Sequence, residues 1–359
     1  MNRRTLSLVA ALIALPLAVA CGDSGDTGST ASSEPTPQTI TLLTYDSFTE
    51  PEVLKDFTAR TGITVRVAKA GDAGTLVNKA ILTKGNPEGD VLWGLDNTLL
   101  SRALGEKGLF VPYESPELGS LDPAATALVP GHEVTPVDTG DVCLNYDKAW
   151  FGDRNIAPPA SFDDLITPAY RDLLVVQNPT TSSPGLAFLL ATVAKYGPEG
   201  FVGWWESLRA NGVTVVDSWD AAYYNEFTQG GSGGTRPIVV SYASSPPATV
   251  IYASDPKPAE PTTATVDATC FRQVEFAGIL QGTKHEEVAR ALIDFLVSEE
   301  FQAALPESNF VYPVRAGVAL PDLFERFAKP AANPLTVNPA DIAANRDNWI
   351  AAWTAAVLQ

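Results

Sequence analysis

The chain has 359 residues, with 24 Lys and Arg against 42 Asp and Glu, and a formal net charge of -18. This length predicts about two domains, and so acidic a chain is poorly suited to binding nucleic acid or an anionic lipid surface. Excess negative charge weakly favours a cationic ligand, although an acidic surface more often serves solubility alone.

The N-terminal residues are typical of a secretory leader. Residues 2–4 contain two arginines, an apolar run follows over residues 6–20, and this run is too short to span a bilayer stably. Residues 18–21 resemble a bacterial lipobox, in which Cys21 is acylated and anchors the protein to the outer face of the cell membrane. Leader cleavage without lipidation is the alternative. Residues 21–38 are rich in Gly, Ser, Thr and Pro and are predicted to form a flexible tether.

From residue 40 onward, apolar strand patterns alternate with helical patterns. The predicted strands cover residues 40–44, 63–67, 91–93, 173–177, 213–216 and 238–240. The first helix has Pro51 near its first turn and Gly62 after its end. Such a βα series predicts a mainly parallel sheet with right-handed crossovers. An irregular stretch over 114–136 and an extended segment over 137–145 separate two series, which indicates a second lobe.

Polar loops follow these strands, at the edge where open α/β sheets bind ligands. Residues 45–47 (Tyr-Asp-Ser), Asp72 and residues 96–97 (Asp-Asn) place three acids at one edge. A ring and a carboxylate together can hold a flat cation through the π face and through Coulomb attraction. The alternative is that these acids only cap helices. In the second lobe, the corresponding loops over 178–185 and 217–219 offer hydroxyls and an indole.

Cys143 and Cys270 are the only cysteines besides Cys21. Outside the cytoplasm, two cysteines without metal-site spacing are predicted to form a disulfide, the alternative being two buried thiols. On the chain-entropy model, such a long loop stabilises the fold by about 4 to 5 kcal/mol.

Two helices are predicted near the C-terminus. Thr283 is expected to cap a helix whose apolar positions recur at helical spacing; these are Val288, Ala291, Leu292, Phe295 and Leu296. A closing helix over 340–358 carries Trp349 and Trp353, which are expected to pack in the core.

Evidence for catalysis or metal binding is weak. The only histidines are His132 and His285, which leaves a histidine-based zinc site or a Ser-His-Asp triad with little support. The loop over 180–185 precedes an apolar helix and could bind a phosphate or form a capped turn. A secreted serine hydrolase using a serine of 180–183 therefore stays a distant alternative. The adjacent Tyr223 and Tyr224 could bind ferric iron, so a ferric-iron receptor is another alternative.

In their order along the chain, the strand-end motifs resemble those of the substrate-binding proteins of bacterial thiamine ABC transporters. The matching segments are 45–48 (Tyr-Asp-Ser-Phe), 94–97 (Gly-Leu-Asp-Asn), 181–186 (Thr-Ser-Ser-Pro-Gly-Leu), Trp219 with Tyr223, Ser241 and Tyr242 with Ser245 and Pro246, and 312–314 (Tyr-Pro-Val). This resemblance implies a type II periplasmic-binding-protein fold, an α/β fold with two lobes, each a mainly parallel sheet with flanking helices, joined by crossover hinge strands. Lobe I would comprise 39–136 and 268–312, and lobe II 137–267 and 313–359.

The resemblance further implies a monomeric receptor, not an enzyme, which needs no cofactor or metal and delivers thiamine or a thiamine phosphate to a permease. By the resemblance, Tyr45, Trp219 and Tyr242 would sandwich the ligand rings, and Asp72 would lie near the aminopyrimidine or thiazolium. Ser182, with its neighbours, would receive the hydroxyethyl or phosphate end. The complete predicted ligand-binding set is Tyr45, Asp46, Ser47, Asp72, Asp96, Asn97, Thr181, Ser182, Ser183, Gly185, Trp219, Tyr223, Tyr242, Phe310 and Tyr312. Phe310 departs from the tryptophan that the family can carry there.

Overall fold

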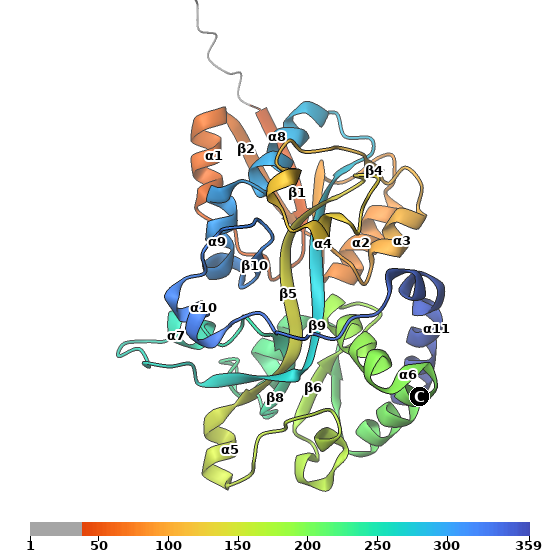
Figure 1. Ribbon diagram of the computed structural model, residues 1–359, viewed down its shortest axis with the longest axis vertical. Helices are drawn as coiled ribbons and strands as arrows, with labels where there is room; N and C mark the ends of the chain where they lie inside the picture. Colours follow the sequence, from red (N-terminus) through yellow and green to blue (C-terminus); the bar gives the residue numbers. More distant parts are fainter. Residues whose placement is uncertain (1–37) are drawn as a thin grey trace, which may run out of the picture. The chain divides into compact units, whose positions relative to one another are not determined.

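A ten-stranded mixed sheet organises residues 38–359, the part of the chain that this computed structural model describes (Figure 1). The strand order is β2-β1-β3-β9-β5-β8-β6-β7, with β4 paired to β9 and β10 paired to β5. The strands are β1 (Gln38–Thr44), β2 (Ile63–Lys69), β3 (Val91–Asp96), β4 (Phe110–Val111), β5 (Thr135–Asp147), β6 (Leu174–Gln177), β7 (Thr214–Val216), β8 (Ile238–Tyr242), β9 (Thr263–Leu280) and β10 (Tyr312–Pro313). The predicted leader, Cys21 and residues 21–37 of the predicted tether lie outside the described residues.

Helices flank this sheet. They are α1 (Val53–Thr61), α2 (Ala73–Leu82), α3 (Leu100–Gly105), α4 (Pro123–Thr126), α5 (Lys148–Arg154), α6 (Ser183–Ala210), α7 (Ala248–Ile251), α8 (Glu286–Leu296), α9 (Glu299–Asn309), α10 (Asp322–Phe327) and α11 (Pro339–Val357), with short helical turns η1 (Leu118–Ser120), η2 (Asp164–Ile166), η3 (Pro168–Tyr170) and η4 (Ala221–Glu226). Gly197 breaks α6 with φ 76° and ψ 167°. No helix within residues 38–359 is long and apolar enough to cross a membrane.

Two sets of parallel strands lie at opposite ends of the long strands β5 and β9 (Figure 1). We call β1, β2 and β3 the first half-sheet and β6, β7 and β8 the second half-sheet. Within each set the pairing is parallel, as the βα pattern predicts. Strand β9 instead runs antiparallel to both β3 and β5, and β5 runs antiparallel to β8. The chain crosses between the half-sheets on these two strands, consistent with the expected α/β fold with crossover strands.

A disulfide ties these two crossover strands together. It joins Cys143 of β5 to Cys270 of β9, with 4.1 Å between the Cα atoms, and so confirms the predicted bridge. Beside it, the Arg272 guanidinium forms an ion pair with the buried Asp141 carboxylate. The crossover strands are therefore fixed to each other by covalent and ionic contacts next to the sheet centre.

The predicted cap of α8 is wrong, because this helix begins at Glu286 and not just after Thr283. The Thr283 hydroxyl donates to Asp90 at 2.5 Å and accepts from the His285 backbone N–H at 3.0 Å, so it stabilises the turn that precedes the helix. The predicted apolar stripe is buried except for the half-buried Ala291.

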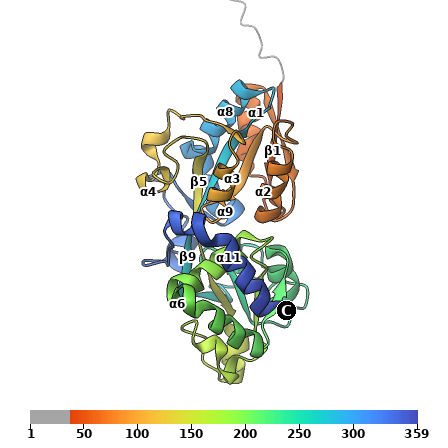
Figure 2. The ribbon, with the colours of Figure 1, turned by 90° about the vertical axis from the view of Figure 1, so that its right-hand side faces the viewer.

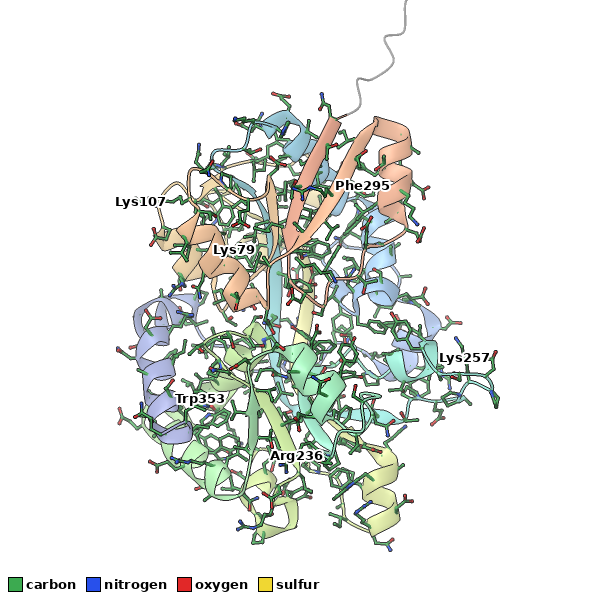
Figure 3. All side chains as sticks on the ribbon, turned by 180° about the vertical axis from the view of Figure 1, so that it is seen from behind. Lys79, Lys107, Arg236, Lys257, Phe295 and Trp353 are labelled. Atoms are coloured by element: carbon green, nitrogen blue, oxygen red, sulfur yellow. A yellow bond between two sulfur atoms is a disulfide. The ribbon has the colours of Figure 1, made fainter. Side chains whose placement is uncertain are left out.

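Helix α11 confirms the predicted closing helix and packs against α6 and α3 (Figure 2). Trp349 and Trp353 are both buried, and the Trp353 ring meets the Trp205 ring of α6 edge to face, with centroids 5.7 Å apart. Figure 3 shows Trp353 on the side of α11 that faces α6. Aromatic edge-to-face pairs add about 0.5–1.5 kcal/mol beyond the area that they bury, so this contact helps to hold the C-terminal helix in place.

Candidate ligand-binding site

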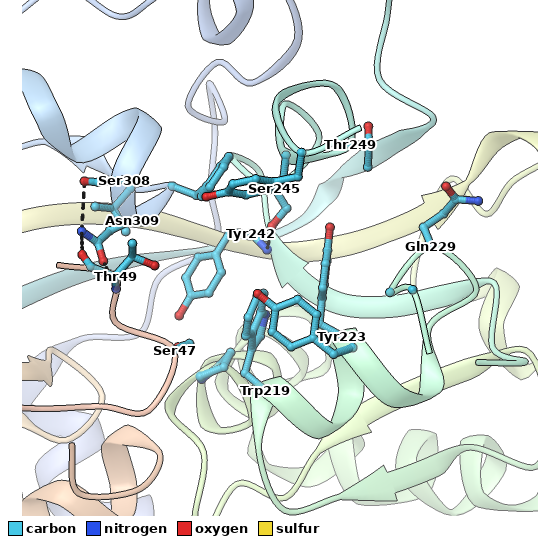
Figure 4. Close-up of a pocket in the computed structure, with 18 of the residues that line it drawn as sticks. Ser47, Thr49, Trp219, Tyr223, Gln229, Tyr242, Ser245, Thr249, Ser308 and Asn309 are labelled. Atoms are coloured by element: carbon cyan, nitrogen blue, oxygen red, sulfur yellow. Dashed lines mark hydrogen bonds between the residues drawn. The ribbon is translucent and has the colours of Figure 1, made fainter. Parts of the chain in front are cut away.

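A cavity of about 540 Å³ opens between the ends of the two half-sheets. Residues from the first half-sheet and its following loops line one side, and residues from the second line the other (Figure 4). Eight members of the predicted set lie in this lining: Tyr45, Ser47, Asp72, Ser183, Trp219, Tyr223, Tyr242 and Phe310. Among residues 38–359, no Lys, Arg or His lines the cavity, whereas Asp72 and Glu275 do. The wall therefore combines aromatic rings with two acidic side chains.

Trp219 and Tyr223 form the aromatic wall on the second half-sheet side. Their rings stack with centroids 4.8 Å apart and planes 16° apart. The indole Nε1–H of Trp219 donates to the Ser241 hydroxyl at 3.0 Å. Stacking and this hydrogen bond together fix the indole plane, so the ring is held ready for a ligand and has few alternative rotamers to lose on binding.

Tyr45 and Tyr242 also line the cavity, and Glu275 lies near both phenols. Burial raises the pKa of both phenols well above the usual value, and the nearby Glu275 carboxyl raises it further, so both stay protonated. Gly94 makes room for Tyr45, because a Cβ there would lie 2.5 Å from Cδ1 of the ring, and its φ of 119° suits only glycine. The sequence after β1 and the glycine in β3 thus position this ring together.

Asp72 connects the two sides of the cavity. As the N-cap of α2, it accepts a hydrogen bond from the Ala73 backbone N–H at 2.7 Å through Oδ1. Its Oδ2 accepts another from the Trp219 backbone N–H at 2.9 Å. Burial raises the pKa of the carboxyl to about 6, although both hydrogen bonds favour its ionised form. Asp72 is thus both a helix cap and a contact between the half-sheets.

Asp96 and Asn97 are not part of the cavity lining. Asp96 is fully buried and accepts from the backbone N–H of Thr98 at 2.7 Å and from the Ser183 hydroxyl. Asn97 accepts from the Val274 backbone N–H at 3.1 Å. These contacts order the turn after β3 and connect Asp96 to the start of α6. Asp96 does not cap the next helix, because the N-cap residue of α3 is Leu99 and no side chain caps it.

Four further members of the predicted set lie beside the cavity. Thr181 donates its hydroxyl to the Asp217 carbonyl at 2.6 Å, and Ser182 is buried as the N-cap residue of α6. Gly185 lies against β6, where a Cβ would meet the Gln177 carbonyl oxygen at 2.6 Å. Asp46 is exposed and accepts from the Gly71 backbone N–H at 3.0 Å. They shape the loops around the cavity without lining it.

Tyr312, the remaining member, is buried in a separate cluster with the Cys143–Cys270 disulfide. Phe310, two positions earlier in the chain, lines the cavity and has a left-handed backbone at φ 54° and ψ 44°. Ser308 and Asn309 precede it at the end of α9 and also line the cavity, near Thr49 (Figure 4). The end of α9 therefore supplies polar groups that the sequence analysis did not include.

Glu275 is the cavity residue whose omission from the predicted set matters most. It lies in β9, is 6% exposed, and faces Asp138 of β5 in the strand register. Burial, followed by the charges of Asp138 and Asp96, raises the pKa of its carboxyl well above the usual range. The available sequence signal was local alternation: Gln273 and Glu275 alternate with the apolar Val274 and Phe276.

Comparison with known proteins assigns the family. Residues 90–345 match the family described as bacterial extracellular solute-binding protein. The chain belongs to this family. It is 34% identical to the thiamine-binding periplasmic protein of Escherichia coli (strain K12), over 89% of this chain and 93% of that protein. A solved periplasmic thiamin binding protein superposes with a TM-score of 0.75 and 32% identity, over 89% of this chain and 96% of that one.

A more distant relative bears on the iron alternative. The iron uptake protein A1 of Synechocystis sp. (strain ATCC 27184 / PCC 6803 / Kazusa) is 24% identical, over 84% of this chain and 82% of that protein. In this chain Tyr223 is buried while Tyr224 is 46% exposed, and their ring planes are 84° apart. Within residues 38–359, no group of three or more His, Cys, Asp or Glu could hold a metal ion.

Proposed function

We propose that this protein is an extracytoplasmic substrate-binding protein that captures thiamine, or a thiamine phosphate, and delivers it to an ABC transporter permease. It acts as a receptor and makes or breaks no bond. The observation that carries this proposal is the cavity wall, which combines aromatic rings with two acidic side chains and, within the described residues 38–359, contains no cationic one. Such a wall suits a planar, positively charged ligand through cation-π and Coulomb attraction. The thiamine-binding names of the relatives support the same ligand.

In this proposal, the aromatic residues that line the cavity hold the two rings of the ligand. Trp219 and Tyr223 act from the second half-sheet, Tyr45 from the first, and Tyr242 from the end of β8. Each aromatic face contributes about 0.5–2 kcal/mol of cation-π attraction to a desolvated cation. Because these contacts come from both half-sheets, they are complete only when the two approach each other, and the ligand therefore biases an open-closed equilibrium.

We also propose two lobes, a cleaved signal peptide and a lipid anchor. Lobe I would comprise 39–136 and 268–312, and lobe II 137–267 and 313–359, with β5 and β9 as the crossover strands. Residues 1–20 would be removed as a signal peptide, and Cys21 would carry the lipid that anchors a monomeric receptor to the membrane. Two acyl chains hold a protein firmly at a bilayer, and residues 21–38 would then serve as the spacer.

Ligand release provides the most direct test. Freshly purified protein is denatured, and the released small molecules are analysed by mass spectrometry, which requires no prior choice of ligand. We expect thiamine or one of its phosphates in near-stoichiometric amount. Titration calorimetry of the ligand-free protein with thiamine and with each phosphate then ranks the forms. If none of them binds, the proposed function is wrong.

A further inference from the structure

The carboxyl group of Glu275 lies at the cavity wall with unused hydrogen-bonding capacity. The residue is 6% exposed, and its buried Oε2 has no hydrogen-bond partner among residues 38–359. Buried polar atoms in folded proteins are nearly always paired, and an unpaired one is costly. The missing partner of Glu275 is therefore expected to come from the molecule that fills the cavity.

The neighbouring side chains do not supply this partner. Asp138 and Asp96 face Glu275 from the paired strands β5 and β3, and neither of these two described residues forms a hydrogen bond with its Oε2. Asp138 takes the indole N–H of Trp93 at 3.0 Å through Oδ2, while its Oδ1 also lacks a partner. No Lys, Arg or His of the described residues lines the cavity. Glu275 is thus surrounded by acids and phenols, without a basic side chain to pair with.

Asp72, the other acid in the lining, differs in this respect. Its Oδ1 accepts from the Ala73 backbone and its Oδ2 accepts from the Trp219 backbone. Each of its oxygens already has a donor, and both donors belong to the protein. Of the two acids that line the cavity, Glu275 is therefore the one with a vacant position for a hydrogen bond from a ligand.

We propose that Glu275 binds the aminopyrimidine end of the ligand, its carboxyl group pairing with the exocyclic amino group and the adjacent ring nitrogen. This inference rests on the proposed function and names the residue that recognises the aminopyrimidine half of the ligand. The carbonyl oxygen of the acid accepts from the amino N–H, and its O–H donates to the ring nitrogen. Both partners are satisfied, and no net charge is buried.

The electrostatic surroundings favour this neutral pair over a simple ion pair. Burial, together with the Asp138 and Asp96 carboxyls, raises the pKa of Glu275 and so favours its protonated form. A protonated carboxyl cannot act as the counter-ion of the thiazolium, but it can form both hydrogen bonds of the pair. The cationic ring would then be held by the aromatic faces of the cavity.

Two variants and two ligands test this pairing by calorimetry. The ligands are thiamine and its analogue in which hydrogen replaces the exocyclic amino group. Wild-type protein should bind thiamine at least about tenfold more tightly than the analogue. Glu275→Gln should keep most of this preference, because an amide can form the same donor-acceptor pair. Glu275→Met should lose the preference and bind thiamine at least about tenfold more weakly. Glu206→Gln, an exposed substitution on α6, serves as the matched control and should change nothing.

Other outcomes overturn the inference. Equal affinity of the wild-type protein for the two ligands would do so without any variant, and it remains decisive even if Glu275→Met does not fold. An equal loss of affinity for both ligands in Glu275→Met would also overturn it. A Glu275→Gln variant that binds thiamine as weakly as Glu275→Met would overturn it too, because that result would indicate that Glu275 acts as a charged counter-ion. Failure of the wild-type protein to bind thiamine or any of its phosphates would instead refute the proposed function.

Discussion

The Oδ2 atom of Asp72 accepts a hydrogen bond from the backbone N–H of Trp219 at 2.9 Å, although 147 positions separate the two residues. Asp72 precedes α2 on the first half-sheet, and Trp219 follows β7 on the second. Nearby, a Cβ on Gly74 would lie 2.5 Å from the Thr181 carbonyl oxygen, so the start of α2 approaches the opposite loop closely. The structure thus represents the two half-sheets in contact across the cavity edge.

Removing this hydrogen bond should weaken ligand binding. Asp72→Ala loses an acceptor that two backbone N–H groups share, and hydrogen bonds to a charged group contribute about 1.5–3 kcal/mol. Because closure contributes to affinity, we expect the Kd for thiamine to rise about tenfold, or about 1.4 kcal/mol. Asp72→Asn keeps one acceptor oxygen and should lose less. Calorimetry measures both variants, and an unchanged Kd in Asp72→Ala would show that the contact does not stabilise the closed state.

The raised pKa of Asp72 predicts how its contribution to stability varies with pH. Since burial raises the pKa from 3.8 to about 6, the folded state holds this proton more tightly than the unfolded state does. The resulting stabilisation is fully present below pH 3.8 and disappears as the pH rises towards 6. Relative to Asp72→Asn, the wild-type free energy of unfolding should therefore increase by about 1–3 kcal/mol between pH 7 and pH 4.

Urea unfolding of both proteins across this pH range measures that difference. The other buried acids, Asp138 and Glu275, are present in both proteins, so their titration largely cancels. A difference that moves in the opposite direction would mean that the hydrogen bonds from Ala73 and Trp219 to the carboxylate outweigh the cost of burying its charge.

Trp219 should be the largest single aromatic contributor to binding. The indole is fixed by Tyr223 and Ser241, so its truncation removes a preformed ring face. For Trp219→Ala we expect thiamine affinity to fall at least about tenfold, equivalent to about 1.4 kcal/mol. Trp219→Phe keeps a ring but loses the hydrogen bond and should show an intermediate loss. Calorimetric affinities that match the wild-type protein in both variants would exclude Trp219 from the site.

The sequence predicts those parts of the fold that depend on patterns within a short segment, and it misses those that depend on contacts between distant segments. The βα pattern from β1 to β3 is read within short windows, and it predicts the parallel pairing correctly. The antiparallel pairing of β9 with β3 is different, because it joins segments that are far apart in the chain. Thr283 shows a related limit: as a possible N-cap it fits the local pattern, but its hydroxyl bonds to Asp90 from a distant loop.

The site divides in the same way. Tyr45, Asp72 and Trp219 follow strands, so the strand-end rule places them at the cavity. Asp96 also ends a strand, but the Thr98 and Ser183 donors that surround it turn it away from the lining. Glu275 lies in the middle of β9 and enters the cavity only because this strand crosses between the half-sheets. Strand-end reasoning has no means of finding such a residue.

Loss of the disulfide should lower stability without abolishing the site. The bond between Cys143 and Cys270 closes a loop with a sequence separation of 127. On the chain-entropy model, opening such a loop costs about 4 to 5 kcal/mol. Urea unfolding of a Cys143→Ala/Cys270→Ala variant measures this loss directly. Thiol titration after denaturation without reduction should give the same count for the variant and the wild-type protein; two additional thiols in the wild-type protein would show that the bridge does not form in solution.

Ferric iron should not bind through the adjacent tyrosines. Iron coordination requires a tyrosinate, but burial raises the pKa of the Tyr223 phenol far above its usual value, and Tyr224 raises it further. The two rings stand nearly perpendicular, 5.6 Å apart between centroids, and Tyr223 is already stacked on Trp219. We therefore expect no visible charge-transfer band when ferric citrate is added to the ligand-free protein. A band that appears in the wild-type protein and vanishes in Tyr223→Phe would make the iron receptor the better interpretation. The Tyr223→Phe variant loses only the phenol oxygen, which is the possible iron ligand.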